Sequence, residues 1–576
     1  MLLSVVIRWK DHFMAYFLKI SHIKKGTYLQ IYESFRDKSR HCSAQRSFKS
    51  LGYLDDLIAS GIDDPISYYK NEVDKMNKKA KKEKEDLAIK KIDESPIKNL
   101  GYFLIKGLFN RLSVKRLLDL LDNIEGETIS TYDYLLNMVS SRIINPCSKI
   151  KTYEEVLPTL FESYNISKDQ VYDKLDFIGD NYSRILEVFN ELYNEKYIRK
   201  TGNVYFDCTN YYFEIDDEDD FRKKGPSKEN RKDPIVGMGL LLDEDQVPLT
   251  MKLYPGNESE KPIIRQCINE MKDRYHMNGR TIQVADKGLN CARNIYEALK
   301  NGDGYIYSQS VKKLEDKEQK WILLDNDYIV VKDSLGNIEF KYKSCIDEFT
   351  YKFDNSIFTI KQIRVASFNP SLAKKQKAEI LKQVDKIKTL SLSQAKRKEY
   401  GDASKYVSFT PINQNGEVDD ESEVIASLNI DKIEKDLSLC GYNLIISSEL
   451  KMNPLDIYHV YHRLWRIEET FRILKSELDA RPVYCHKQNT IYGHFLICYL
   501  SVFILRVLQI KKFHDKIPAN KIINFIRSFI VLKEKDRITN LSSKDKILPF
   551  ANSLNLNLDN YLFKPKDVQK LLNLKI

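Results

Sequence analysis

The spacing of hydrophobic residues changes several times along the chain and predicts the secondary structure region by region. Alternating runs over residues 16–20 and 28–33 predict short strands near the N-terminus. Residues 75–91 carry eight lysines with little apolar spacing, which is typical of a solvated helix or a linker. Apolar residues then recur at intervals of three and four, and this pattern predicts helices over residues 103–121, 132–144 and 183–197. Between them, residues 145–149 (Asn-Pro-Cys-Ser-Lys) form a turn that we expect to cap the next helix.

From residue 202 onward the hydrophobic period becomes that of strands. We expect strands at residues 204–206, 236–242, 249–254, 282–285 and 304–308. Strand-like pieces continue between residues 320 and 365, followed by a charged helix over 372–387 and a strand over 442–446. From Pro454 the pattern is helical nearly to the end of the chain. Mixed strands, inserted material and then helices predict an α/β fold.

These patterns suggest six regions, which we expect to act as domains or parts of domains. The list is residues 1–100, a small β region and lysine-rich linker; 101–200, a helical region; 201–310, the first part of an α/β core; 311–440, a mostly β insertion; 441–510, the second part of the core; and 511–576, a C-terminal helical region. The length of 576 residues excludes a single small binding module.

Charge and composition leave the partner open. The chain has 92 basic and 82 acidic residues, a formal charge of +10, and its 35 tyrosines are interleaved with the basic groups. Such surfaces suit nucleic acids, but many ordinary soluble proteins look similar. None of the nine cysteines has zinc-finger spacing, and the apolar stretch at residues 495–505 is shorter than the roughly 20 residues that cross a bilayer. We therefore expect a cytoplasmic protein with free thiols.

Two aspartates stand where predicted strands end. Asp207 follows the run at 204–206, and Asp286 follows the run at 282–285 and precedes a turn into a helix. Open sites form at strand ends in α/β sheets, although an isolated aspartate there is often a turn or cap residue. The two aspartates indicate a functional site only if a third acidic residue lies close to them.

The segment from residue 461 to 475 offers that acid. At about 100° per residue, Tyr461, Glu468 and Lys475 share one face of a continuous helix, with Arg472 on the same side. The same arithmetic places Glu468 at the edge of the buried stripe and points Glu469 into solvent. An amphipathic helix with a charged flank would show the same pattern.

Three acids from separate segments would form an oxygen-only ligand set. Such sets suit hard ions such as Mg²⁺ or Mn²⁺, and two ions about 3.5–4 Å apart can drive phosphodiester displacement. Tyr461, Arg472 and Lys475 could then contact DNA phosphates beside the ions.

Six short motifs occur in order along the chain. They are Tyr205-Phe206-Asp207-Cys208-Thr209, Gly225-Pro226-Ser227-Lys228 with Arg231, Tyr254-Pro255-Gly256-Asn257, Ala285-Asp286-Lys287-Gly288, the helix with Tyr461, Glu468 and Lys475, and Arg481-Pro482-Val483-Tyr484 with His494. Any one of them alone is weak. With these motifs in this order, the chain resembles bacterial insertion-sequence transposases of the DDE type over roughly residues 14–510.

The resemblance implies an RNase H-like mixed sheet flanked by helices, interrupted by a mostly β insertion and preceded by a helical DNA-end-binding region. Asp207, Asp286 and Glu468 would hold two Mg²⁺ or Mn²⁺ ions and be catalytic. Tyr461, Arg472, Lys475, Lys228 and Arg231 would contact DNA. Where the family signature has an arginine, this chain has Leu464, which puts one phosphate contact in doubt.

The activity that the resemblance implies is metal-dependent cleavage at the terminal inverted repeats of an insertion sequence and joining of the 3′-hydroxyls to target DNA, by a homodimer on DNA. Two alternatives stay open. One is a catalytically inactive, transposase-derived DNA-binding protein, and the other is an RNase H-like nuclease without strand transfer. Neither a membrane nor an organic cofactor is expected to take part.

Overall fold

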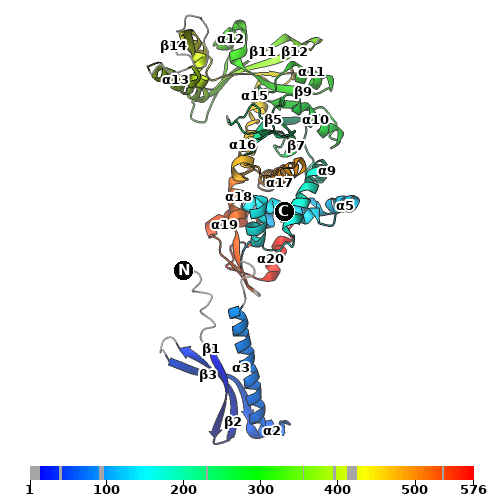
Figure 1. Ribbon diagram of the computed structural model, residues 1–576, viewed down its shortest axis with the longest axis vertical. Coiled ribbons are helices and arrows are strands. Elements are labelled where there is room, and N and C mark those ends of the chain that lie inside the picture. Colours follow the sequence, from blue (N-terminus) through cyan, green and yellow to red (C-terminus); the bar gives the residue numbers. More distant parts are fainter. Residues whose placement is uncertain are drawn as a thin grey trace. The chain divides into compact units, whose positions relative to one another are not determined.

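The computed structural model describes residues 13–37, 42–89, 96–228, 231–354, 356–392, 397–411, 424–534 and 537–576. The chain divides into two compact units, Met1–Ser95 and Pro96–Ile576 (Figure 1). Each unit is described by itself.

The first unit is an antiparallel sheet with a long helix beside it. Strands β1 (Phe13–Ile23), β2 (Gly26–Asp37) and β3 (Cys42–Tyr53) pair in sequence order, and α2 (Leu54–Ala59) and α3 (Pro65–Ile89) follow. Leu29 and Ile31 of β2 are buried together with Val73 of α3. The lysine-rich segment is therefore largely helical, since α3 covers most of residues 75–91.

The second unit is built on a nine-stranded mixed sheet. Its strand order is β10-β11-β12-β15-β9-β8-β5-β6-β7. Only the β5–β8 and β8–β9 pairs are parallel; the other pairs in this sheet are antiparallel. The strands are β5 (Asn203–Tyr212), β6 (Ile235–Leu242), β7 (Pro248–Pro255), β8 (Ile282–Ala285), β9 (Gly304–Gln309), β10 (Ile329–Lys332), β11 (Ile338–Phe353), β12 (Ser356–Phe368) and β15 (Tyr442–Ser447). The expected α/β class is confirmed, and all five strands expected between residues 202 and 310 are present.

Helices surround this sheet and form most of the remaining unit. They are α4 (Phe103–Leu112), α5 (Lys115–Glu125), α6 (Thr131–Ile144), α7 (Lys149–Lys151), α8 (Lys168–Asp180), α9 (Tyr182–Tyr197), α10 (Ile263–Asp273), α11 (Ala292–Lys300), α12 (Asp316–Leu323), α13 (Pro370–Leu392), α14 (Ile430–Ser438), α15 (Pro454–His462), α16 (Trp465–Arg472), α17 (Gln488–Val507), α18 (Ala519–Ser528), α19 (Lys544–Leu554) and α20 (Pro565–Leu572). The helix expected over 103–121 is interrupted, because Ser113 takes a left-handed conformation between α4 and α5. As expected, the turn before α7 caps it, since the Ser148 side chain accepts from the Lys151 amide.

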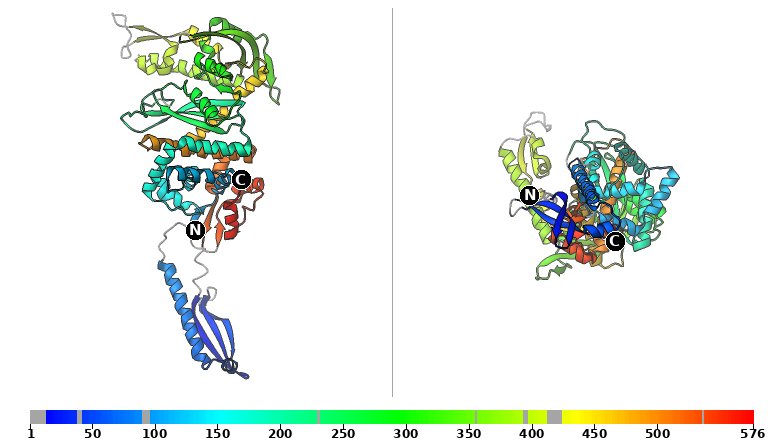
Figure 2. Two further views of the ribbon diagram at one scale, coloured as in Figure 1. Left: turned by 90° about the vertical axis from the view of Figure 1, so that its right-hand side faces the viewer. Right: turned by 90° about the horizontal axis from the view of Figure 1, so that it is seen from below.

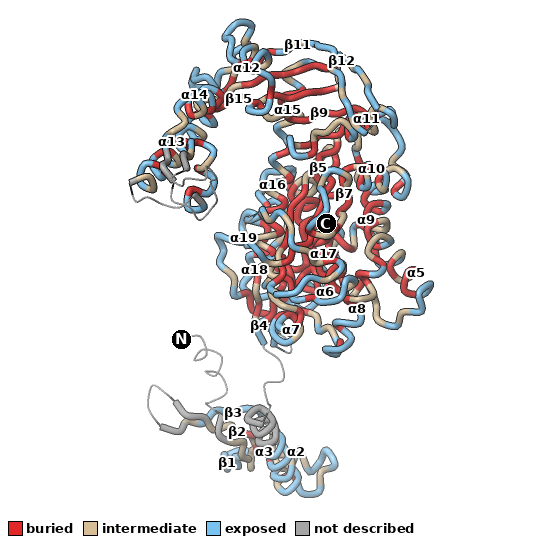
Figure 3. The backbone as a smooth tube through the Cα atoms, turned by 45° about the horizontal axis from the view of Figure 1, so that its top comes forward, coloured by how far each residue is buried: buried red, intermediate tan, exposed pale blue. Residues whose placement is uncertain are grey.

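Helix α17 is the central helix of this unit. It packs against β7 on one side and against α6 and α8 on the other, beneath the sheet in Figure 2. With the π-helical turn η7 (Leu508–Lys512) it is long and apolar enough to cross a membrane, so the expectation of a shorter apolar stretch is wrong. Its residues are almost entirely buried inside the protein (Figure 3), which is the environment of a core helix.

The secondary structure of the insertion and of the C-terminal region differs in part from what we expected. Strands β10, β11 and β12 extend the main sheet, whereas α13, the 3₁₀ segment η5 (Arg397–Tyr406) and α14 share a small core with the β13 (Val407–Pro411) and β14 (Val424–Leu428) hairpin. Near the C-terminus, β16 (Ile530–Lys533), β17 (Ile538–Asn540) and β18 (Leu562–Phe563) form a sheet with β4 (Ile97–Asn99). The expectation of a helical C-terminal region is wrong in part: α18, α19 and α20 are present, but the sheet was missed because it depends on pairing with a distant strand.

Candidate catalytic site

The two predicted aspartates lie on neighbouring parallel strands at the centre of the sheet. The register pairs Phe206 of β5 with Ala285 of β8, so Asp207 and Asp286 are the next residues along the two strands. Adjacent strands are about 4.8 Å apart, so the two carboxylates share one site. We expected Asp207 at the end of a strand, and this is wrong. Strand β5 continues past it to Tyr212 through its pairing with β6. Only β8 ends here.

Asp207 is held in an electrostatically unfavourable position. Burial, together with the negative charges of Glu260 and Asp286, raises its pKa to about 6. The positive charge of Lys228 and a hydrogen bond of 2.7 Å from the Cys208 amide to Asp207 Oδ1 oppose this rise. Negative charge is therefore concentrated at Asp207, and a bound cation would stabilise the ionised carboxylate.

Asp286 is oriented by two hydroxyl groups from other elements. Its Oδ1 accepts a hydrogen bond of 2.7 Å from Ser308 Oγ of β9 and one of 3.0 Å from the Tyr461 hydroxyl of α15. Burial raises the pKa of Tyr461, so this hydroxyl keeps its proton and acts as a donor. Tyr461, which we expected to contact DNA phosphate, is thus placed as a positioning residue for Asp286.

The segment from 461 to 475 is not one continuous helix. Helix α15 ends at His462, α16 begins at Trp465, and a π-helical turn, η6 (Ile473–Glu477), follows Arg472. The positions calculated at 100° per residue for a continuous helix from Tyr461 to Lys475 are therefore not valid across these breaks. The placement of Glu469 in solvent is wrong. Its carboxylate accepts from the fully buried Arg506 of α17 at 3.0 Å and from Arg466 at 3.1 Å.

Glu468 has an exposed side chain on α16, and α16 packs against β5. Within the described ranges, no group of three or more His, Cys, Asp or Glu side chains lies close enough together to hold a metal ion. The structure thus gathers Asp207 and Asp286, and it does not gather Glu468 with them.

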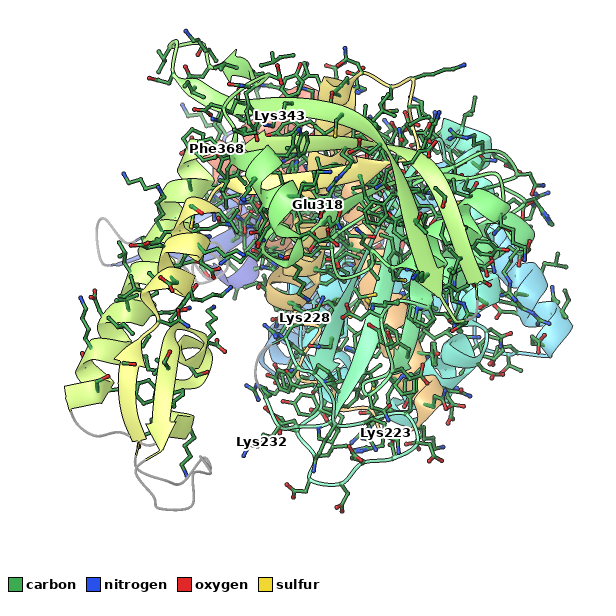
Figure 4. All side chains as sticks on the ribbon, turned by 90° about the horizontal axis from the view of Figure 1, so that it is seen from above. Lys223, Lys228, Lys232, Glu318, Lys343 and Phe368 are labelled. Atoms are coloured by element: carbon green, nitrogen blue, oxygen red, sulfur yellow. The ribbon has the colours of Figure 1, made fainter. Side chains whose placement is uncertain are left out.

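Basic side chains flank Asp207 from two elements. Lys228, on the connection between β5 and β6 (Figure 4), donates to the Cys208 carbonyl and lies 3.5 Å from Glu260. Lys475 of η6 has a pKa lowered to about 8 by burial and by Lys228, while Asp207 acts in the opposite direction. Of the other expected DNA contacts, Arg472 is exposed and Arg231 stacks on the Tyr212 ring at 3.8 Å.

Sequence reasoning missed Glu260. A cavity of about 350 Å³ brings the two glycine motifs together beside it, with Lys228, Tyr254 and Glu260 in its wall. A Cβ atom at Gly225 would collide with the Gly256 carbonyl oxygen, so close contact between the motifs requires glycine there. Glu260 lies only three residues after Asn257, and that proximity was the available signal.

Comparison with known families identifies the class of protein. A family model described as "Transposase DDE domain" matches residues 213–504, about half of the chain. The protein is a transposase by class, and it belongs to the Transposase DDE domain family. The match confirms the resemblance expected from the motifs; it includes Asp286 and Glu468 and begins six residues after Asp207.

Among solved structures, the chain is similar to that of "piggyBac transposase synaptic complex with hairpin DNA". The identity is 9%, the TM-score is 0.35, and the alignment covers 70% of this chain and 71% of the other. A search of curated proteins gives no match.

Proposed function

We propose that the protein is an active DDE transposase that binds the ends of its insertion sequence, cleaves them by metal-dependent phosphodiester hydrolysis and joins the 3′-hydroxyls to target DNA. The observation that carries this proposal is the placement of Asp207 and Asp286 side by side on β5 and β8. An RNase H-like core is supported by the antiparallel β5–β6–β7 meander that continues into parallel β8 and β9.

The carboxylate pair suits Mg²⁺ or Mn²⁺, which prefer oxygen ligands. Asp207 and Asp286 would hold the ions, and we propose Glu468 as the third ligand. When bound, two such ions activate the attacking oxygen and stabilise the leaving oxygen. Ser308 and Tyr461 fix the orientation of Asp286, while Lys228 favours the ionised form of Asp207.

Around this centre, the proposed DNA contacts are the basic groups of Lys228, Arg231, Arg472 and Lys475. Lys475 is the nearest candidate for a phosphate close to the ions, because its ammonium group interacts with both Asp207 and Lys228. The proposed partners are the terminal inverted repeats and target DNA, bound by a homodimer in the bacterial cytoplasm.

The test uses purified full-length protein, DNA from the flanks of the coding region, and Mn²⁺. We expect strand nicks with the wild-type protein and loss of nicking with binding retained in Asp207→Ala, Asp286→Ala and Glu468→Ala. Asp217→Asn is the control, since Asp217 is an exposed carboxylate on the connection between β5 and β6 that is not a proposed ligand. A Glu468→Ala variant that still nicks would remove Glu468 from the ligand set.

A second candidate is a DNA-binding protein without catalysis. It is favoured by one observation, that Leu464 stands where the family signature has an arginine. Footprinting of the end DNA without cleavage in Mg²⁺ or Mn²⁺ would support it. A nuclease without strand transfer would nick the same DNA but would not join its 3′-hydroxyl to a second duplex.

A further inference from the structure

A large cavity lies outside the candidate catalytic site, between the connection from α6 to α7 and the chain that leads from η6 into α17. Its volume is about 870 Å³, more than twice that of the cavity beside Glu260. Its wall includes Arg142 and Lys149 from the first segment and Asp479 and His494 from the second. Two sequence motifs that the catalytic site does not use therefore meet here: residues 145–149 and residues 481–484 with His494.

Two buried cations line this cavity without a carboxylate partner. Arg142 and Lys149 are 5% and 6% exposed, and within the described part of the chain neither forms an ion pair. A buried charge is normally paired, because removing it from water is costly. An anion in the cavity would supply the partner that the protein itself does not provide.

The hydrogen bonds of Lys149 leave it able to bind such an anion. Its Nζ lies 3.3 Å from His494 Nδ1, and His494 Nε2 lies 3.3 Å from the Ala480 carbonyl oxygen. Burial lowers the pKa of His494, so the neutral ring donates from Nε2 and accepts from Lys149 at Nδ1. Burial and the nearby Arg142 lower the pKa of Lys149 to about 8, which still leaves it mostly protonated at neutral pH with two further N–H donors.

The remaining charges of the cavity are also mainly positive. Lys151 adds a third cation, and Asp479, which is exposed, is the one carboxylate in the wall, so the Lys, Arg and Asp side chains carry a net charge of 3 − 1 = +2. Arg142 Nη1 donates to the Leu478 carbonyl at 3.4 Å, and a guanidinium group has five N–H donors in all. A phosphate group, with its several acceptor oxygens, matches this set of donors.

Aromatic and basic side chains connect the cavity with the candidate catalytic site. Lys475 lies 5.4 Å from the centre of the Tyr211 ring, and that ring contacts Phe495, the neighbour of His494, at 4.7 Å. Arg481 lies 5.9 Å from the Tyr212 ring. Tyr211 and Phe495 are fully buried, so their contact runs through the core, and Lys475 and Arg481 are the basic groups that lie beside β5.

We propose that the cavity around Arg142 and Lys149 binds a phosphate group of the DNA backbone while Asp207 and Asp286 act on another part of the same DNA. This proposal rests on the proposed function, because DNA is the substrate there. A free phosphate ion would use the same donors, and the experiment distinguishes the two sources.

The experiment measures the Kd of a duplex from the DNA flanking the coding region at several NaCl concentrations, in EDTA so that no cleavage occurs. Each phosphate contact contributes about 0.9 to the slope of log K against log salt. We expect Lys149→Gln to lower the slope by about that amount and to weaken binding several-fold, and Lys149→Arg to restore both. Lys174→Gln is the matched control, because Lys174 is also buried but pairs with Asp122 and Glu127 and is not part of the cavity wall.

A folded Lys149→Gln protein with wild-type slope and Kd would overturn the proposal, with folding checked by circular dichroism and melting temperature. A second measurement uses the wild-type protein and inorganic phosphate at constant ionic strength. If phosphate raises the melting temperature in a Lys149-dependent way but the DNA slope is unchanged, the ligand is free phosphate and the DNA assignment is wrong. If the wild-type protein fails to bind the duplex at all, the proposed function itself is wrong.

Discussion

Replacing Asp207 by asparagine should stabilise the metal-free protein. The site raises the pKa of this carboxyl from 3.8 to about 6, so the folded state binds its proton more tightly than the unfolded state does. A difference of about 2 pKa units corresponds to about 3 kcal/mol of destabilisation at pH 7, where the unfolded carboxyl is fully ionised. Asparagine removes this charge and keeps an oxygen that can accept from the Cys208 amide.

The pH dependence gives the sign of the effect. A raised pKa means that the stabilising contribution of the protonated group is complete below about pH 4 and is lost as the pH rises through about 6. The advantage of Asp207→Asn over the wild type should therefore be largest at pH 7 and fall below about 1 kcal/mol at pH 4.

The assay is thermal and denaturant unfolding in EDTA, followed by a signal from the second unit. Asp217→Asn is the control, because it removes an equal charge from an exposed position. Adding Mg²⁺ should raise the melting temperature of the wild-type protein and leave that of Asp207→Asn unchanged. A variant that is less stable than the wild type at pH 7, or equally stable at pH 7 and pH 4, would refute the electrostatic argument.

Further predictions concern the same region. Lys228→Met should move the acidic limb of the cleavage pH profile to higher pH than that of the wild type, because Lys228 lowers the pKa of Asp207; an unchanged limb would show that Asp207 does not control it. Glu469→Gln should cost about 3–5 kcal/mol of stability, since it leaves Arg506 buried and unpaired. Glu468→Gln, at an exposed position, should stay within about 0.5 kcal/mol of the wild type in the same unfolding assay, and equal losses for the two variants would contradict this assignment.

Local hydrophobic periodicity was enough to predict the central strands and several helices. The run at 236–242 is β6, whose residues are all buried, and the helix expected at 132–144 is α6, most of whose residues are buried. The sequence showed that Asp207 and Asp286 each come directly after an apolar run. Their position side by side depends on the pairing of β5 with β8, which local periodicity does not encode.

The parts that sequence reasoning missed depend on contacts between distant residues. The sheet near the C-terminus needs β4, more than 400 residues before β16, and no local pattern reveals that pairing. Glu469 was placed in solvent because its partner Arg506 lies 37 residues away on α17. The role of Tyr461 was missed for the same reason, because its hydroxyl reaches Asp286 across 175 residues of sequence.

The departure at Leu464 is explained by the structure. Leu464 is 7% exposed and packs into the main core at the start of α16, immediately after the break between the two helices. An arginine side chain in this environment would bury a charge, so position 464 is not available for a phosphate contact. Positive charge near Asp207 comes instead from Lys228 and Lys475, on the β5–β6 connection and on η6. Position 464, at the break between the two helices, is thus apolar and buried. The π-helical turn after α16 instead places Lys475 near Asp207.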